Sequence, residues 1–256
     1  MIIESIILLA LAEMLNLISP MLENGARLLL IENAPLMSIY PFWEFILFNV
    51  CVPILCIAGT IIALMFVLSN DEQSRAESKK RLQDFIKIVI IISVSFILYL
   101  TLSEVFTFIA KEIWNFGGDQ YIFYHTENIL EWLFFGAFYS VALLLADLTL
   151  VIRYILVTSG SLFVLIALMI YPIPHLKRWS YGIITILITA NTLSVIDIII
   201  LKIGGLVYTS LGQQMNLGII SIATWLLVAI VNYTLITYSF SSIHSNNFIK
   251  NYLTRC

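Results

Sequence analysis

The chain has 256 residues, of which 61% are hydrophobic and 11% are charged, with a formal net charge of −3. Soluble domains are about half apolar and about a quarter charged, so this composition excludes an ordinary soluble domain. The low net charge and the apolar content also exclude a disordered chain. The apolar runs are continuous and do not alternate with polar residues, which excludes an outer-membrane barrel. We therefore predict an all-α fold, a polytopic bundle of transmembrane helices in a single domain.

The first apolar run lies in residues 2–31. It opens with Glu4 and not with basic residues, which argues against a signal peptide. We expect its first helix to cover residues 2–18 and to end before Pro20. Four polar side chains of this region fall within one arc of about 120° at 100° per residue: Glu13, Asn16, Ser19 and Glu23. The pattern predicts a helix that lies in the membrane interface and does not cross the bilayer.

A transmembrane helix needs ~20 mostly apolar residues to cross ~30 Å of hydrocarbon. Five later runs meet this requirement and are predicted to cross fully: residues 45–68, 86–110, 132–152, 181–201 and 217–240. Tyr40, Phe42 and Trp43 precede the first of them and are interpreted as an interfacial aromatic belt. The third is predicted to stop at Arg153. Residues 241–256 form a polar tail.

Residues 154–171 are a further apolar run, which follows Arg153 without a loop. The run contains Thr158-Ser159-Gly160-Ser161, and this quartet weakens a helix locally. We therefore predict a kinked or re-entrant element with a hinge at Ser159 and Gly160. A serine nucleophile would need a base within hydrogen-bond reach, and none of the predicted spans contains a histidine.

Basic residues indicate the orientation in the membrane. Four of them lie between the first two crossings: Arg75, Lys79, Lys80 and Arg81. Cytoplasmic loops are enriched in Lys and Arg, so residues 70–84 are expected in the cytoplasm. If residues 154–171 do not cross fully, most other basic residues fall on the same side, which favours an outside N-terminus and a cytoplasmic tail. The basic stretch itself is either a topology anchor near anionic lipid or a docking surface for a soluble partner such as a motor ATPase.

Charged residues inside hydrocarbon are costly, so each one requires an explanation. Glu104, Asp147 and Asp197 lie four to six residues from the ends of the predicted spans, which allows either placement near the interface or exposure to a water-lined lumen. Asn191, Ser194 and Asp197 form one polar stripe along a helix, and Asn232 lies near the middle of the last span. Such amides either hydrogen-bond a neighbouring helix or face a pore.

Motifs of enzyme chemistry are missing from the sequence. It has no Walker-type nucleotide-binding motif and no HExxH zinc motif. Its three histidines, at positions 125, 175 and 244, lie in different segments. We therefore predict that the protein is not an enzyme, and we assign no catalytic residue, cofactor or metal.

The order of elements carries a resemblance. The basic stretch Arg75-x-x-x-Lys79-Lys80-Arg81-Leu82 follows the first span. Leu150-Val-Ile-Arg153-Tyr-Ile-Leu precedes an apolar stretch that ends in Pro172-Ile-Pro-His-Leu-Lys-Arg-Trp179, and a final pair of spans follows. From about residue 20 to residue 240 this pattern resembles the TrbL family, the polytopic inner-membrane subunits of conjugation and type IV secretion machines. It is most similar to the CedA family, the membrane subunits of crenarchaeal Ced DNA-import systems.

The resemblance implies a non-enzymatic conduit for DNA import in an archaeal cell membrane. The implied partners are a cytoplasmic motor ATPase and a pilin-like small membrane protein with two spans, with DNA as the transported substrate. It implies no catalytic residues, and it implies a structural role for Arg153 and for the turn at residues 172–179.

The charges inside the predicted spans bear on this expectation. A lumen that passes a polyanion should be basic or neutral, whereas the charges inside the predicted spans are mainly acidic. A single copy with so few helices is also too small to enclose a channel for DNA, so we expect a homo-oligomer or a hetero-assembly. Two alternatives stay open. One is a small cation- or proton-coupled transporter in which Glu104, Asp147 and Asp197 face a cavity, and the other is a structural membrane subunit without a pore.

Overall fold

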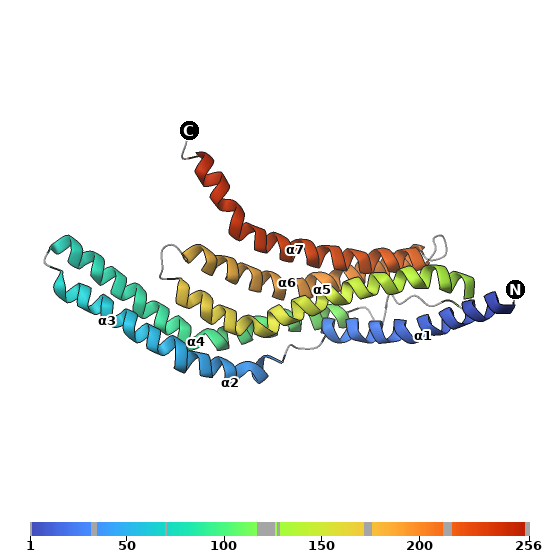
Figure 1. Ribbon diagram of the computed structural model, residues 1–256, viewed down its shortest axis with the longest axis horizontal. Helices are drawn as coiled ribbons and strands as arrows, with labels where there is room; N and C mark the ends of the chain where they lie inside the picture. The colour runs from blue at the N-terminus through green and yellow to red at the C-terminus, as the bar shows by residue number, and fades with distance from the viewer. Residues whose placement is uncertain are drawn as a thin grey trace. The chain divides into compact units, whose positions relative to one another are not determined.

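The computed structural model describes residues 2–31, 35–69, 71–116, 126, 129–171, 176–211 and 217–253. Every element in these ranges is a helix, which confirms the predicted all-α fold (Figure 1). The elements are α1 (Ile2–Ile31), α2 (Leu36–Ile46), the π-helix η1 (Leu47–Cys51), α3 (Val52–Leu68), α4 (Glu72–Asn115), α5 (Ile129–Ile170), α6 (Lys177–Leu211) and α7 (Leu217–Leu253).

Five helical stretches in the described part of the chain are long and apolar enough to cross a membrane: Leu36–Leu68, Glu72–Asn115, Ile129–Ile170, Lys177–Ser210 and Leu217–Ser241. Each contains one of the five predicted crossings. The prediction of a multi-pass helical bundle with five full spans is therefore confirmed at the level of length and composition. Several of these helices exceed what a bilayer requires. The 44 residues of α4, for example, extend about 66 Å at ~1.5 Å per residue.

The α5 helix corrects one boundary. Residues 132–152 and 154–171 were predicted as separate elements divided at Arg153, but residues 129–170 form one continuous α-helix of 42 residues. Arg153 lies near the middle of this helix. A helix passes through a charged residue when the side chain finds a partner inside the bundle, so the charge does not mark an end.

The α1 helix is also longer than expected. It runs from Ile2 to Ile31 and contains Pro20, which was predicted to end it. Ala12, on the N-terminal side of the proline, and Ala26 and Leu30, on its C-terminal side, are all buried in the same core. Packing on both sides of the proline holds the helix together although Pro20 contributes no backbone N–H.

The chain divides into two compact units. The first comprises residues 1–33, 104–155 and 189–238. Its core joins side chains of α1, α4, α5, α6 and α7, with Tyr139, Leu143, Leu150, Ile198, Trp225 and Val228 among its fully buried members. Small residues of α5, Ala142 and Ala146, lie in the same core and allow neighbouring helices to approach closely.

The second unit comprises residues 34–103, 156–188 and 239–256. Its main core contains Trp43, Cys51, Ile92, Phe96 and Leu165. Trp43 is only 4% exposed, and its ring lies 5.3 Å from that of Phe96. The indole of Trp43 therefore packs against α4 inside the unit and is not presented on its surface, and the interfacial aromatic belt stays a prediction. Tyr40 and Phe42 are exposed.

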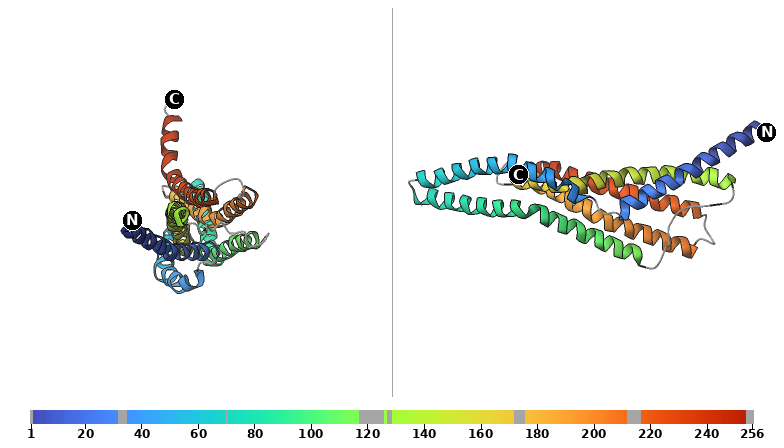
Figure 2. Two further views of the ribbon diagram at one scale, coloured as in Figure 1. Left: turned by 90° about the vertical axis from the view of Figure 1, so that its right-hand side faces the viewer. Right: turned by 90° about the horizontal axis from the view of Figure 1, so that it is seen from below.

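Within this second unit, α3 and the first half of α4 form an antiparallel hairpin (Figures 1 and 2). The Phe85 ring lies 3.0 Å from the position that a Cβ would take on Gly59, so the missing side chain permits this close approach. Residues 70–84 were predicted as a loop, but α4 already begins at Glu72. The basic residues of this stretch are therefore presented on the first turns of a helix.

Candidate functional site

The most unusual feature of the first unit is an ion pair buried between its helices. Arg153 of α5 is 4% exposed, and the side chain of Asp197 of α6 is fully buried. Arg153 donates a hydrogen bond from Nη1 to Asp197 Oδ2. Its Nη2 donates a second bond to the backbone carbonyl of Leu29 in α1, at 2.6 Å. One guanidinium therefore connects three helices.

Asn232 of α7 completes the network. Its Nδ2 lies 2.6 Å from Asp197 Oδ1 and 3.0 Å from the Val228 carbonyl, and donates to both. Both oxygens of the Asp197 carboxylate therefore accept hydrogen bonds, one from Arg153 and one from Asn232. We call Arg153, Asp197, Asn232 and the Leu29 carbonyl the four-helix network, because they come from α5, α6, α7 and α1.

Physical chemistry explains why these groups must meet. An isolated charge in a medium of low dielectric constant costs several kcal/mol, and the attraction of an opposite charge offsets that cost only with good geometry and additional hydrogen bonds. The four-helix network supplies both. It orders four segments that are far apart in the sequence, and it leaves neither charge unpaired.

The predicted polar stripe of α6 faces the interior of the bundle. Asn191 and Asp197 are buried, and Ser194 is half-buried and donates from Oγ to the backbone carbonyl of Asn191. The amide of Asn232 donates a hydrogen bond to Asp197 on a neighbouring helix, which is one of the two interpretations left open by the sequence. The structure therefore shows contact between helices for both Asn232 and Asp197.

The three acidic residues have different environments. Glu104 of α4 is exposed. Asp147 of α5 is half-buried, and its Oδ2 lies 3.4 Å from the position that a Cβ would take on Gly25 of α1. The Oδ1 atom of Asp147 is buried and has no hydrogen-bond partner among the residues that the structure describes. Within the described ranges, Asp197 is the one of the three that is paired with a basic residue, so the three carboxylates do not share one arrangement.

The α1 helix contributes polar contacts to the same unit. Ser19 is buried, and its hydroxyl lies 3.0 Å from that of Ser140 in α5. Tyr139 donates from its hydroxyl to Glu23 Oε1 at 2.9 Å. Ser19 and Glu23 belong to the stripe predicted to face the membrane surface, but these two side chains bond to α5. Part of the predicted polar face of α1 is therefore a packing face.

The predicted hinge has a distinct role in the second unit. A Cβ on Gly160 would lie 2.0 Å from the hydroxyl of Tyr99, which occupies the space above the glycine. The Tyr99 hydroxyl donates to the Val157 carbonyl at 2.8 Å. Gly160 is buried and Ser159 half-buried within the continuous α5 helix. Because Gly160 has no side chain, Tyr99 of α4 can approach the α5 backbone closely. A hinge at Ser159 and Gly160 stays a prediction.

The four basic residues at the start of α4 are exposed: Arg75, Lys79, Lys80 and Arg81. Arg81 forms an ion pair with Glu77 at 2.7 Å, one turn earlier on the same helix. Of the turn at residues 172–179, positions 172–175 lie outside the described residues. Lys177, which follows them, places its ammonium 4.9 Å from the centroid of the Tyr171 ring.

Sequence reasoning missed the pairing of Arg153 with Asp197, because Arg153 was interpreted as the end of a span. A signal for burial was present: apolar runs flank Arg153 on both sides with no turn residue between them. A single basic residue within such a run is an indication that an acidic partner lies on another helix.

These features define a class, an all-α polytopic membrane protein in which a buried arginine and a buried aspartate of different helices are paired. No protein-family model matches the chain. No curated protein and no solved structure is significantly similar to it. Function must therefore be argued from the residues and from their arrangement.

Proposed function

We propose that the chain is a non-enzymatic pore or scaffold subunit of a membrane machine that imports DNA. In this proposal it works with a cytoplasmic motor ATPase and a small two-span membrane protein in the cell membrane. The DNA-specific part rests on the resemblance in element order to the TrbL and CedA families.

The observation that carries the proposal is the position of Arg153. This residue is one of the few that match the pattern of those families, where its implied role is structural. Here it lies at the centre of the four-helix network, bonded to Asp197 and to the Leu29 carbonyl. A buried and fully paired arginine supports a role in holding helices in place and gives no support to a role in binding a polyanion.

The same network bears on where a passage would form. Because Asp197 and Arg153 are turned toward each other, their charges are not available to line a channel within the first unit. Only 6% of the most apolar part of Leu36–Leu68 is buried. This stretch therefore leaves a large surface for lipid or for other subunits. We therefore propose that any passage for DNA is formed between several chains.

A deletion strain tests the function directly. Cells that lack this gene should fail to acquire marked chromosomal DNA from neighbouring cells and should grow normally on ordinary solutes. The wild-type gene and a Glu104→Gln variant should restore uptake, because Glu104 is exposed and outside the network. Undiminished uptake in the deletion strain would contradict the proposal, and a growth defect on a particular solute would favour a transporter.

One observation favours a second candidate, a proton- or cation-coupled transporter. Asp147 has a buried carboxylate oxygen without a partner in the described part of the chain, which is the kind of group that proton carriers use. Asp147→Asn should then abolish solute-driven ion flux in proteoliposomes, whereas Glu104→Gln should not. Equal flux in both variants would remove this candidate. A chain that supports neither DNA uptake nor flux, but is needed to assemble its partners, would be a structural subunit without a pore.

Docking of the motor ATPase at the basic start of α4 stays part of the proposal. Replacing Lys79 and Lys80 by Glu reverses two exposed charges without touching the Arg81–Glu77 pair. Loss of the motor from the purified assembly is expected. Unchanged co-purification would exclude this surface as its docking site.

A further inference from the structure

The free end of the α3–α4 hairpin places an apolar helix beside a polar one. Residues 57–68 of α3 contain no charged residue, and Ile57, Leu64 and Leu68 are all more than half exposed. The facing turns of α4 are rich in both charges. Their antiparallel register is set by two contacts: Gly59 against Phe85, and the Arg75 guanidinium 5.7 Å from the centroid of the Phe66 ring.

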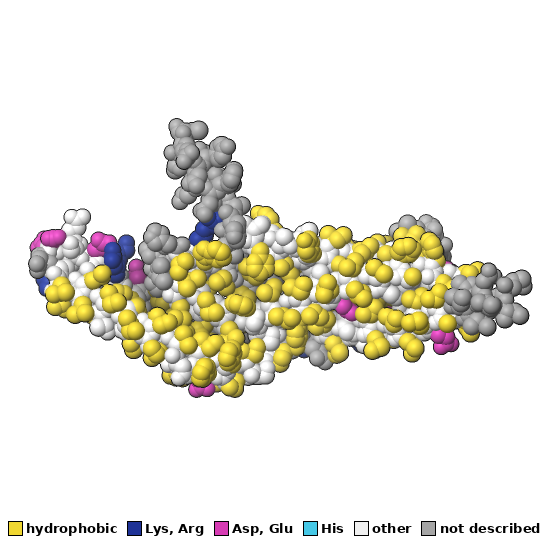
Figure 3. All heavy atoms as spheres, in the orientation of Figure 1, with side chains coloured by type: hydrophobic (Ala, Val, Ile, Leu, Met, Phe, Trp, Pro, Cys, Tyr) yellow, Lys and Arg dark blue, Asp and Glu magenta, His cyan; other side chains and the backbone are white. Residues whose placement is uncertain are grey.

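The two helices have opposite solvent requirements along about 18 Å of their length, at ~1.5 Å per residue. The exposed apolar side chains of α3 require hydrocarbon, and the charges of α4 require water or lipid headgroups. Both requirements are met at the boundary between the hydrocarbon and the lipid headgroups. In Figure 3, a group of acidic and basic side chains lies at this end of the hairpin, next to a surface that is mostly apolar.

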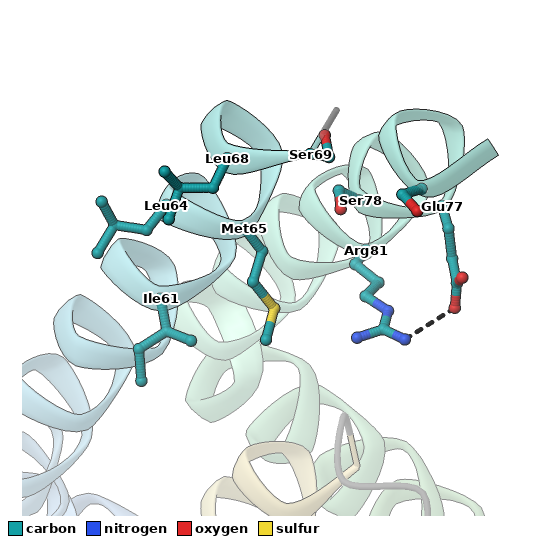
Figure 4. A pocket seen from close by; sticks show the side chains of 9 residues that line it. Ile61, Leu64, Met65, Leu68, Ser69, Glu77, Ser78 and Arg81 are labelled. Carbon is teal, nitrogen blue, oxygen red and sulfur yellow. Dashed lines mark hydrogen bonds and ion pairs between the residues drawn. The ribbon is translucent and has the colours of Figure 1, made fainter. Parts of the chain in front are cut away.

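A groove lies between the two helices at this end (Figure 4). The groove is shallow and open along its length, with a volume of about 470 Å³. On one side α3 contributes Ile61, Leu64, Met65 and Leu68. On the other side α4 contributes Ser78, Glu77 and Arg81. The groove is thus apolar along one wall and polar, with one guanidinium, along the other.

We propose that this groove binds an anionic membrane lipid. An acyl chain lies along the apolar wall formed by α3, and the phosphate accepts hydrogen bonds from Arg81 and Ser78. Charge complementarity selects the anionic headgroup, since Arg81 is the basic residue among those that line the groove and its guanidinium is exposed.

The apolar wall identifies the occupant as lipid and not as a soluble protein. It continues into the rest of α3, in which no residue is buried, and this helix lies within one of the five membrane-spanning stretches. The groove is therefore continuous with an apolar surface of the kind that faces hydrocarbon in a membrane-spanning helix. An acyl chain can enter it from the bilayer without crossing water.

Glu77 limits the affinity. It pairs with Arg81 at 2.7 Å, and both side chains are more than half exposed. Exposed pairs of this type are weak, so a phosphate can replace the carboxylate as the partner of Arg81. Removal of the Glu77 charge should therefore strengthen lipid binding, which no purely structural role of the pair would produce.

The test uses the full chain purified in a neutral detergent and titrated with phosphatidylglycerol, phosphatidylcholine or inorganic phosphate, with bound lipid counted by native mass spectrometry. We expect saturable retention of one phosphatidylglycerol and little retention of phosphatidylcholine. Arg81→Gln should weaken binding roughly tenfold through loss of a charge-assisted hydrogen bond, and Glu77→Gln should strengthen it. Lys79→Gln is the matched control. It removes the same charge, but two residues along a helix lie about 200° apart, so it faces away from the groove.

A second variant tests the apolar wall. Met65→Trp should fill the groove and reduce lipid retention, with an unfolding temperature in lipid-free detergent close to that of the wild type.

Equal losses of lipid binding in Lys79→Gln and Arg81→Gln would overturn the proposal, because the attraction would then be nonspecific. Equal retention of phosphatidylcholine, or binding of inorganic phosphate alone, would also overturn it. If the wild type retains no lipid, and the Arg81→Gln variant no longer co-purifies with a co-expressed motor ATPase, the groove binds a protein partner and the lipid proposal is overturned. None of these results depends on DNA uptake.

Discussion

Two ion pairs of the same chemistry lie in opposite environments of this protein. In the first unit, Arg153 and Asp197 are 4% and 0% exposed, and each makes a further hydrogen bond to another helix. In the second unit, Arg81 and Glu77 are 57% and 64% exposed and belong to adjacent turns of one helix. The first pair therefore joins helices that are distant in sequence, whereas the second adds nothing to tertiary structure. The contrast teaches that the position of a charge in the fold decides whether it holds the fold or remains available for binding.

The largest effect is expected from breaking the buried pair. Arg153→Ala or Asp197→Ala leaves one charge buried without a partner, which costs about 3–5 kcal/mol in the free energy of unfolding. Reversible unfolding in mixed detergent measures this loss. The double variant Arg153→Met, Asp197→Leu removes both charges and should recover much of the stability. A double variant as unstable as the sum of both single variants would show that the pair is not an energetic unit.

The next largest effect is expected at Gly160. A Cβ at this position collides with the hydroxyl of Tyr99, which is 3% exposed and donates to the Val157 carbonyl. Gly160→Ala should cost about 1–3 kcal/mol through overpacking, although alanine is the better helix former. Gly25→Ala is the control, since its Cβ would be at ordinary contact distance, 3.4 Å from Asp147. Thermal unfolding of both variants in detergent compares them, and equal stability would contradict the close approach of Tyr99.

A smaller effect is expected at Asn232. Asn232→Leu removes the bond to Asp197 Oδ1 and keeps the side-chain volume, but Arg153 remains as the partner of the carboxylate. Interhelical hydrogen bonds in membranes contribute ~0.6 kcal/mol on average and up to ~1.7 kcal/mol. We expect a loss of about 1–2 kcal/mol, measured by the same unfolding assay. In the background of the Arg153→Met, Asp197→Leu double variant the loss should nearly vanish.

The smallest effect on stability is expected at the exposed pair. Arg81→Gln should change the free energy of unfolding by less than about 1 kcal/mol, because water and salt screen charges at the surface. Unfolding in low and high salt measures this small difference. A loss as large as that of Arg153→Ala would mean that the hairpin end is covered in the folded protein, and it would remove the contrast between the two pairs.

Sequence and structure agree on what depends on neighbours along the chain. The five apolar runs were recognisable because a helix in hydrocarbon must satisfy its backbone internally and present apolar side chains on most sides. The polar stripe of Asn191, Ser194 and Asp197 was recognisable from the helical period alone. The boundaries were less accurate at Pro20 and Arg153. Proline usually interrupts a helix and a charge usually ends an apolar span, but here packing around Pro20 and the pairing of Arg153 override those tendencies.

The partners of the polar residues could not be predicted from local sequence. Asp197 lies 44 residues from Arg153 and 35 from Asn232, and Leu29 contributes a carbonyl that every residue has. The burial of Trp43 and the contact of Gly160 with Tyr99 likewise depend on another helix. Composition and periodicity alone established a helical membrane protein, because each segment in hydrocarbon must by itself be apolar and satisfy its own backbone hydrogen bonds. Only the tertiary structure decided which charges are neutralised and which stay free, because that choice depends on side chains brought together from distant helices.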